Sequence, residues 1–100
     1  MIVSDARTQA RRLNLLVEGH VQGIGFRYST CAIAAQFPIA GFVKNLPDGN
    51  VEIVVEGDEN EIGNFLTALR LHRIYRYVTR EHIAWSPPRG DFRDFSISYF

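Results

Sequence analysis

The chain has 100 residues, 46% of them hydrophobic, which suits one domain with a small buried core. Its 11 basic and 11 acidic side chains cancel, which excludes the broad positive surface expected of a partner for nucleic acid or an anionic membrane. A single cysteine excludes an internal disulfide or a cysteine-based metal cluster, and no apolar run suits a signal peptide or a membrane span, so we expect a cytoplasmic protein. We also expect it to be a monomer.

The N-terminal segment is polar, and we expect residues 1–12 to form a flexible tail before a single domain at residues 13–100. The first element of that domain is a strand at residues 13–19, LNLLVEG. Its alternation predicts one apolar face, made of Leu13, Leu15 and Val17.

A helix and a hairpin follow. Residues 26–37 carry apolar side chains at helical spacing, and Pro38 ends the predicted helix. Residues 39–45 and 51–56 predict two strands, joined by LPDGN, whose proline and glycine are typical of a tight turn.

The second half of the chain repeats the pattern. Asp58 and Glu61 predict a capping box at the start of a second helix. The apolar stripe of that helix is Ile62, Phe65, Leu66 and Leu69. Residues 77–85 and 94–99 predict two further strands, with SPPRGD as the loop between them.

The order of these elements is strand, helix, strand, strand, helix, strand, with a short last strand. That order predicts an α+β fold, the ferredoxin-like βαββαβ sandwich, with two helices on one face of a mainly antiparallel sheet of four to five strands.

The stretch GHVQGIGFR, residues 19–27, places three glycines between the first strand and a helix that begins beside Arg27. Successive glycines let backbone N–H groups converge on an anion, and the start of a helix adds more of them. The guanidinium of Arg27 matches phosphate oxygens, and a bound anion offsets the poor position of a cation at a helix N-terminus. The spacing is neither of the two common nucleotide-binding motifs. The competing interpretation is a tight turn beside a solvated arginine.

Asn45 ends the second predicted strand. In the expected topology this strand ends at the same end of the sheet as residues 19–27, and the third strand lies between the two. Asn45 is therefore expected to face that loop. It shares strand parity with Val43, which directs its amide to the helix-covered face, where a polar group needs partners. The competing interpretation is an asparagine that starts the turn.

GHVQGIGFR closely resembles the acylphosphatase signature, and GFVKNLPDG resembles the second motif of that family, in the right order and at the usual separation. The resemblance implies a hydrolase without metal or cofactor that splits small acyl phosphates into carboxylate and phosphate. It implies that Arg27 and nearby backbone amides hold the phosphoryl group, while Asn45 positions the attacking water. The amides belong to Gly23, Ile24, Gly25, Phe26 and Arg27.

The chain departs from the family in three places. Phe42 and Lys44 stand where the family often has tryptophan and arginine, and both keep the character of the residue. The segment LHRIYRYVTREH lacks the usual Gly-Pro loop, so the family gives no guide to strand boundaries after Leu71.

Other patterns have simpler interpretations. The basic run could bind a polyanion, but a solvated helix end and strand are the simpler interpretation. The run consists of Arg70, Arg73, Arg76 and Arg80. The three histidines, His20, His72 and His82, lack metal-ligand spacing, and Cys31 fits a small, partly buried apolar position.

Three alternative functions stay open at this point. An RNA-recognition domain has the same element order, but the expected outer face carries Glu52, Val54 and Glu56 on the third strand and lacks the aromatic residues that stack bases. A non-catalytic module could use the same loop to sense acyl phosphates. The third alternative is the acylphosphatase-like domain of carbamoyl-phosphate-using maturation proteins.

Overall fold

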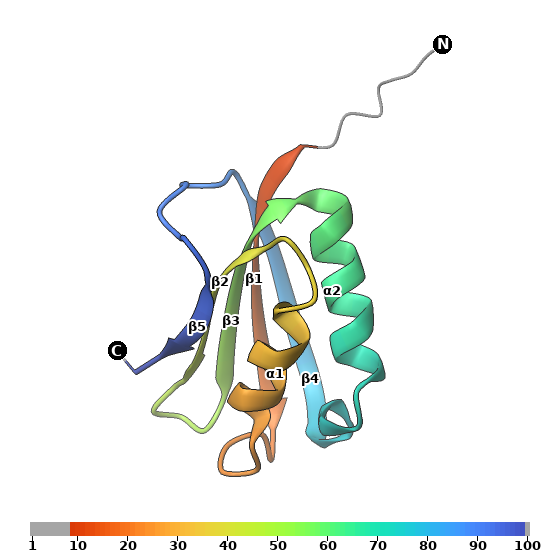
Figure 1. The fold of residues 1–100 in the computed structure, drawn as a ribbon. Helices are drawn as coiled ribbons and strands as arrows, with labels where there is room; N and C mark the ends of the chain where they lie inside the picture. The colour runs from red at the N-terminus through yellow and green to blue at the C-terminus, as the bar shows by residue number, and fades with distance from the viewer. Residues whose placement is uncertain (1–8, 100) are drawn as a thin grey trace.

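A five-stranded sheet backs two helices in the computed structural model, which describes residues 9–99 (Figure 1). In chain order the elements are β1 Ala10–Gly19, α1 Phe26–Ala34, β2 Ala40–Asn45, β3 Val51–Asp58, α2 Glu59–Leu71, the 3₁₀ turn η1 Arg73–Tyr77, β4 Val78–Ser86 and β5 Phe95–Ser98.

The strands lie in the order β4-β1-β3-β2-β5. All neighbours are antiparallel except β2 and β5, which are parallel. Because β3 lies between β1 and β2 and runs against both, β1 and β2 run in the same direction. This arrangement confirms the ferredoxin-like α+β sandwich, and it puts the end of β2 and the loop after β1 at the same end of the sheet (Figure 1).

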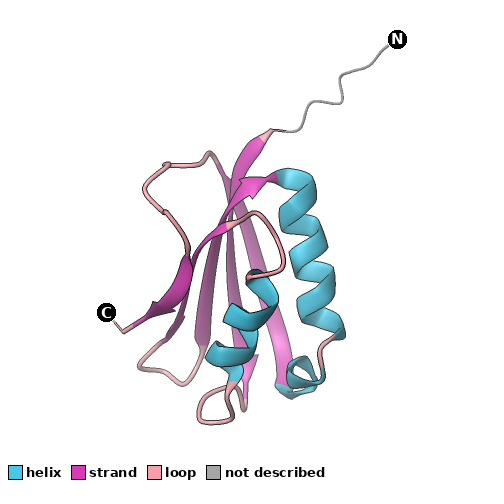
Figure 2. Ribbon diagram, viewed as in Figure 1, coloured by secondary structure: helices cyan, strands magenta, loops and turns pink. Residues whose placement is uncertain are grey.

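Both helices cover the same face of the sheet (Figure 2). The predicted apolar faces meet there: Leu13, Leu15 and Val17 of β1 are fully buried. The predicted stripe of α2 is buried against them, as are Phe26 and Ile33 of α1. Among the helices within residues 9–99, none is long and apolar enough to cross a membrane.

Two boundaries at the start of the fold differ from those predicted. β1 begins at Ala10, so residues 10–12, expected in the tail, belong to the strand and pair with residues 56–58 of β3; residues 1–8 lie outside the described part. The first helix ends at Ala34 rather than at residue 37. Its last turn tightens, because Phe37 donates its N–H to the carbonyl of Ala34, three residues earlier, just before the proline.

The bounds of β2, β4 and β5 lie within one residue of the prediction, and three features of the later elements differ by more. β3 continues to Asp58, two residues beyond the predicted end. Asp58 caps α2 through the N–H of Asn60 at 2.9 Å, rather than through the expected capping box with Glu61. η1 was not predicted; His72 starts it by accepting the N–H of Ile74 at 3.1 Å.

The outer face of the sheet differs most from expectation. Val54 and Glu56 were expected to be exposed, yet they retain 1% and 7% of their accessible surface. The connection between β4 and β5 covers this face, since Phe92 packs on Phe42 with ring centroids 5.9 Å apart. Arg89 and Gly90 of the same connection donate their backbone N–H groups to the carboxylate of Glu56.

Candidate active site

The loop after β1 owes its shape to two glycines. Gly23 and Gly25 have φ of 78° and 84°, in the left-handed region that other residues rarely adopt. A Cβ at either position would meet open space, so the backbone conformation, and not crowding, is what requires glycine.

Gly25 is also the N-cap residue of α1. Within residues 9–99 no side chain caps this helix, and no acidic residue lies in its first turn, so its first N–H groups can receive an anion from outside the chain.

Arg27 is the second residue of α1, where a cation lies against the positive end of the helix dipole. Its guanidinium carbon lies 5.3 Å from the centroid of the Tyr99 ring. The charge is therefore held at a position that becomes favourable once a negative group occupies the same end of the helix.

Asn45 is the last residue of β2 and pairs with Val51 of β3. Its Oδ1 atom is buried and, within the described residues, has no hydrogen-bond partner. An unpaired buried acceptor costs free energy and is uncommon in folded proteins, so this oxygen indicates a donor that comes with a ligand or water.

These groups line one cavity of about 130 Å³. Its lining consists of Val21, Gly23, Gly25, Phe26, Arg27, Tyr28 and Asn45. The structure thus brings together the predicted site residues Arg27, Asn45, Gly23, Gly25 and Phe26. The side chain of Ile24 instead lines a second cavity on the other side of the loop.

Gln22 fixes the distance between the loop and Asn45. Its side-chain amide donates to the carbonyl oxygens of Leu46 and Asn50, each at 2.8 Å. The loop is thereby tied to the turn that follows Asn45. The sequence signal was a long amide side chain inside the glycine-rich motif, but its partners became visible only with the folded turn.

Some of the other residues considered from the sequence have ordinary structural contacts. Arg70 pairs with Glu81, whose Oε2 lies 2.5 Å from the guanidinium, and this hydrogen bond lowers the pKa of Glu81. Burial raises the pKa of the Cys31 thiol, as expected for a partly buried position. Residues 9–99 hold no group of three or more His, Cys, Asp or Glu side chains suited to a metal ion.

Comparison with known proteins assigns the chain to a family. The acylphosphatase family profile matches residues 13–97. The chain belongs to the acylphosphatase family. It is 39% identical to an acylphosphatase of Thermotoga petrophila over 90% of this chain and 99% of the relative.

Solved structures agree. The acylphosphatase of Bacillus subtilis superimposes with a TM-score of 0.81 at 37% identity, over 89% of this chain and 99% of that one. Full-length HypF, in a phosphate- and nucleotide-bound form, gives a TM-score of 0.81 at 26% identity over 91% of this chain but only 12% of HypF.

The enzyme hydrolyses the carboxyl-phosphate bond of acyl phosphates, which are small molecules. This confirms the predicted acylphosphatase activity over the sensing and RNA-binding alternatives.

Proposed function

We propose that Arg27 and the backbone amides of residues 23–27 hold the phosphoryl group of the acyl phosphate, and that Asn45 holds the attacking water. The observation that carries this assignment is the buried, unpaired Oδ1 of Asn45 in the same cavity as Arg27. Because this oxygen has almost no accessible surface in the structure, a slight turn of the amide toward the cavity lets it accept an O–H from that water, which completes the missing hydrogen bond.

The reaction requires the protein to position the attacking water and to stabilise the charge of the phosphoryl group, and little else. The water oxygen forms a bond to phosphorus, the bond from phosphorus to the acyl oxygen breaks, and its electron pair leaves with the carboxylate. The proton of the water passes to a phosphate oxygen. Because a carboxylate is a stable leaving group, the rate depends on alignment of the water and on stabilisation of the phosphoryl charge.

Arg27 supplies that charge stabilisation. Its guanidinium donates two N–H groups to the phosphoryl oxygens, and the first amides of α1 add further donors at the positive end of the helix. These donors are fixed by the glycine conformations of the loop before the substrate binds, which is the condition for strong electrostatic stabilisation.

One kinetic experiment tests both roles. Steady-state rates with benzoyl phosphate, and inhibition by inorganic phosphate, are measured for Arg27→Ala and Asn45→Ala. We expect Arg27→Ala to lose about 100- to 1,000-fold in rate and to bind phosphate more weakly, because the arginine holds the ground state as well. We expect Asn45→Ala to lose about 100-fold in turnover with a near wild-type inhibition constant.

Two exposed residues of the same types serve as controls. Arg93→Ala and Asn64→Ala remove an arginine and an asparagine outside the cavity, and both variants are expected to keep wild-type kinetics. Wild-type phosphate inhibition in Arg27→Ala, or full turnover in folded Asn45→Ala, would contradict the assignment.

We further propose that residues 10–99 act as one domain, as a monomer in the cytoplasm, with no nucleic-acid partner. The lone thiol fits a reducing compartment. The outer sheet face is covered by the β4–β5 connection at Val54 and Glu56, and the aromatic ring on that part of the face, Phe42, is packed against Phe92 of the connection instead of being open to a base. Light scattering after size-exclusion chromatography, at several protein concentrations, tests whether the protein is a monomer. A filter-binding assay with single-stranded RNA tests whether it binds nucleic acid.

A further inference from the structure

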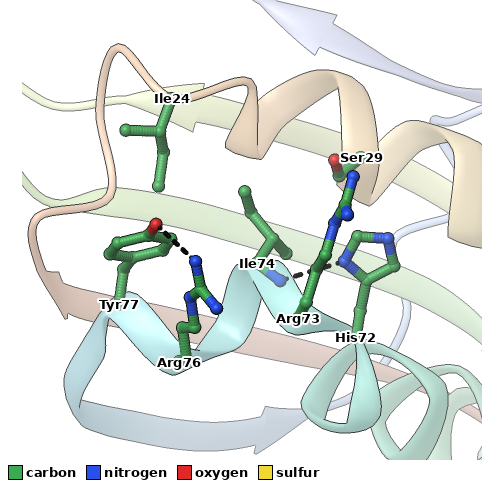
Figure 3. Close-up of a pocket in the computed structure, with 7 residues that line it drawn as sticks. All are labelled: Ile24, Ser29, His72, Arg73, Ile74, Arg76 and Tyr77. Atoms are coloured by element: carbon green, nitrogen blue, oxygen red, sulfur yellow. Dashed lines mark hydrogen bonds between the residues drawn. The ribbon is translucent and has the colours of Figure 1, made fainter.

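A second cavity, of about 410 Å³, lies between α1 and the 3₁₀ turn η1 (Figure 3). Its lining includes Ile24, Ser29, Arg73, Ile74, Arg76 and Tyr77. Ile24 and Ser29 come from the loop and α1, and the other four come from η1.

The cavity is positively charged. Arg73 and Arg76 both line it, and no carboxylate from residues 9–99 does. Among residues 9–99, neither arginine has a carboxylate within ion-pair distance, whereas Arg70 is neutralised by Glu81. Arg76 donates instead to the neutral hydroxyl of Tyr77, at 3.0 Å. Two charges that no acidic side chain compensates favour an anion in this cavity.

The cavity also has an apolar wall. Ile24 points from the loop toward Tyr77, and Ile74 lies between the two arginines (Figure 3). Ile24 and Tyr77 are each 37% exposed, so they offer apolar surface to a ligand, while Ile74 closes the floor at 8%. A ligand that suits this lining has a hydrocarbon part and a negatively charged end.

The two cavities share a wall. Ile24 lines the second cavity, and its neighbours Gly23 and Gly25 line the first. Because Ile24 directly follows Gly23 and precedes Gly25, and consecutive Cα atoms are about 3.8 Å apart, one stretch of backbone separates the two cavities. A substrate held by its phosphoryl group in the first cavity can therefore extend its acyl chain over Ile24 into the second.

We propose that the second cavity binds the acyl group of the substrate, and that this acyl group carries a negative charge at its far end, which Arg73 and Arg76 hold. The inference rests on the proposed phosphoryl site at Arg27 and Asn45. It assigns the enzyme a substrate class: acyl phosphates derived from acids with a second anionic group.

The test compares two substrates of equal chain length. Adipoyl monophosphate ends in a carboxylate, and hexanoyl phosphate ends in a methyl group. The measured quantity is the ratio of kcat/KM for adipoyl monophosphate to that for hexanoyl phosphate. In Arg73→Gln/Arg76→Gln we expect this ratio to fall by about 3- to 10-fold, the effect of losing two solvent-exposed ion pairs, with hexanoyl phosphate little affected.

The control variant, Arg80→Gln/Arg93→Gln, removes two charges outside both cavities and is expected to leave the ratio unchanged. The inhibition constant of free phosphate is expected to stay at the wild-type value in both double variants. An equal fall of the ratio in both double variants, or no fall in either, would overturn the proposal. A weaker phosphate inhibition in Arg73→Gln/Arg76→Gln would also overturn it, because these arginines would then act on the phosphoryl site.

A measurement on the unmodified enzyme does not depend on how the variants fold. Raising NaCl from about 0.05 M to about 0.5 M screens exposed charge pairs, so the wild-type ratio is expected to fall. A ratio that salt does not change would overturn the proposal. If hydrolysis of hexanoyl phosphate still depended on Arg27 and Asn45, the proposed phosphoryl site would stand although the acyl-group proposal had failed. The failure of the one proposal can thus be told from the failure of the other.

Discussion

The guanidinium of Arg27 lies over the ring of Tyr99, with its carbon 5.3 Å from the ring centroid. Tyr99 follows β5, whose Ser98 pairs with Lys44 of β2. The ring therefore lies at the end of the sheet where Asn45 ends β2. The parallel pairing of β5 with β2 thus places an aromatic platform under the proposed phosphoryl-binding arginine. Cation–π contacts of this kind restrain the direction of a long side chain.

Replacing Tyr99 with alanine is expected to weaken phosphate inhibition by about 2- to 5-fold, the range that an exposed cation–π contact supports. The Tyr99→Phe variant keeps the ring and is expected to retain wild-type inhibition, which makes it the matched control. The measurement is the inhibition constant of inorganic phosphate in the benzoyl phosphate assay. Unchanged inhibition in Tyr99→Ala would mean that Arg27 keeps its position without the ring.

Asn45→Asp changes the charge of the proposed water-binding group at nearly constant shape. The aspartate keeps an acceptor for the water but loses the N–H donor, and its negative charge repels the phosphoryl group. We expect turnover no higher than in Asn45→Ala, about 100-fold below wild type, together with weaker phosphate inhibition than alanine gives. Phosphate inhibition as strong as in wild type would show that Asn45 does not lie beside the bound phosphate.

The sequence predicted the central part of the fold because its signals are local. The alternating strands and the apolar stripe of α2 each follow from periodicity within one segment. Arg27 and Asn45 could be paired in advance because the βαββαβ order alone puts the end of β2 beside the loop after β1. Their 18-residue separation in sequence therefore did not hide their proximity.

The missed features depend on long-range contacts that no local pattern encodes. The position of Tyr99 depends on the register of β5 against β2, and β5 has only four residues. The covering of Val54 and Glu56 depends on the path of the proline-containing β4–β5 connection, which has no period. η1 follows α2 without a helical or strand period of its own, and its cavity forms only when the turn packs against the loop and α1, so the cavity had no sequence signal.

Chelation is expected to leave the activity unchanged. In the proposed mechanism Arg27 and the loop amides meet the phosphoryl charge, and the carboxylate leaves without Lewis-acid assistance. The measurement is the benzoyl phosphate rate before and after dialysis against millimolar EDTA. Complete loss of activity that Mg²⁺ or Zn²⁺ restores would require a metal in the reaction and would contradict the mechanism.

Gln22 is expected to act on the rate through position. Gln22→Ala removes the two hydrogen bonds that tie the loop to Leu46 and Asn50. A small misplacement of catalytic groups lowers rates strongly, so we expect kcat to fall by about 10- to 100-fold, with retained secondary structure in circular dichroism. Gln36→Ala, which removes an exposed glutamine with one long contact of 3.5 Å, is the control. Wild-type kcat in Gln22→Ala would show that the loop holds its geometry without this side chain.

Glu56 makes the stability of the fold depend on acid pH. Burial alone would raise the pKa of this carboxyl, but hydrogen bonds from the Arg89 and Gly90 backbone and from Arg12 outweigh burial and hold the pKa below its ordinary value. Arg12 lies 2.7 Å away and forms an ion pair with it. The folded protein therefore takes up the proton only at a lower pH than the unfolded chain does.

The sign of the effect follows from that order of pKa values. Near pH 7 the carboxylate is charged in both states, and its folded-state contacts contribute fully to the free energy of unfolding. As the pH falls below about 4.3, the usual value for an unfolded glutamate, the unfolded chain takes up the proton first, and the contribution is lost as the pH falls through the lower folded-state pKa.

We expect Glu56→Gln to lower the free energy of unfolding by about 1.5–3 kcal/mol at neutral pH, and by much less under strongly acidic conditions. Urea unfolding at several pH values measures this difference. Glu52→Gln is the matched control, because Glu52 lies on the same face of β3 and, among residues 9–99, forms no ion pair and accepts a hydrogen bond from the neutral amide of Asn14, at 3.1 Å. A Glu56→Gln deficit that is the same at neutral and acid pH would mean that the shape of the side chain, and not its charge, holds the β4–β5 connection on the sheet.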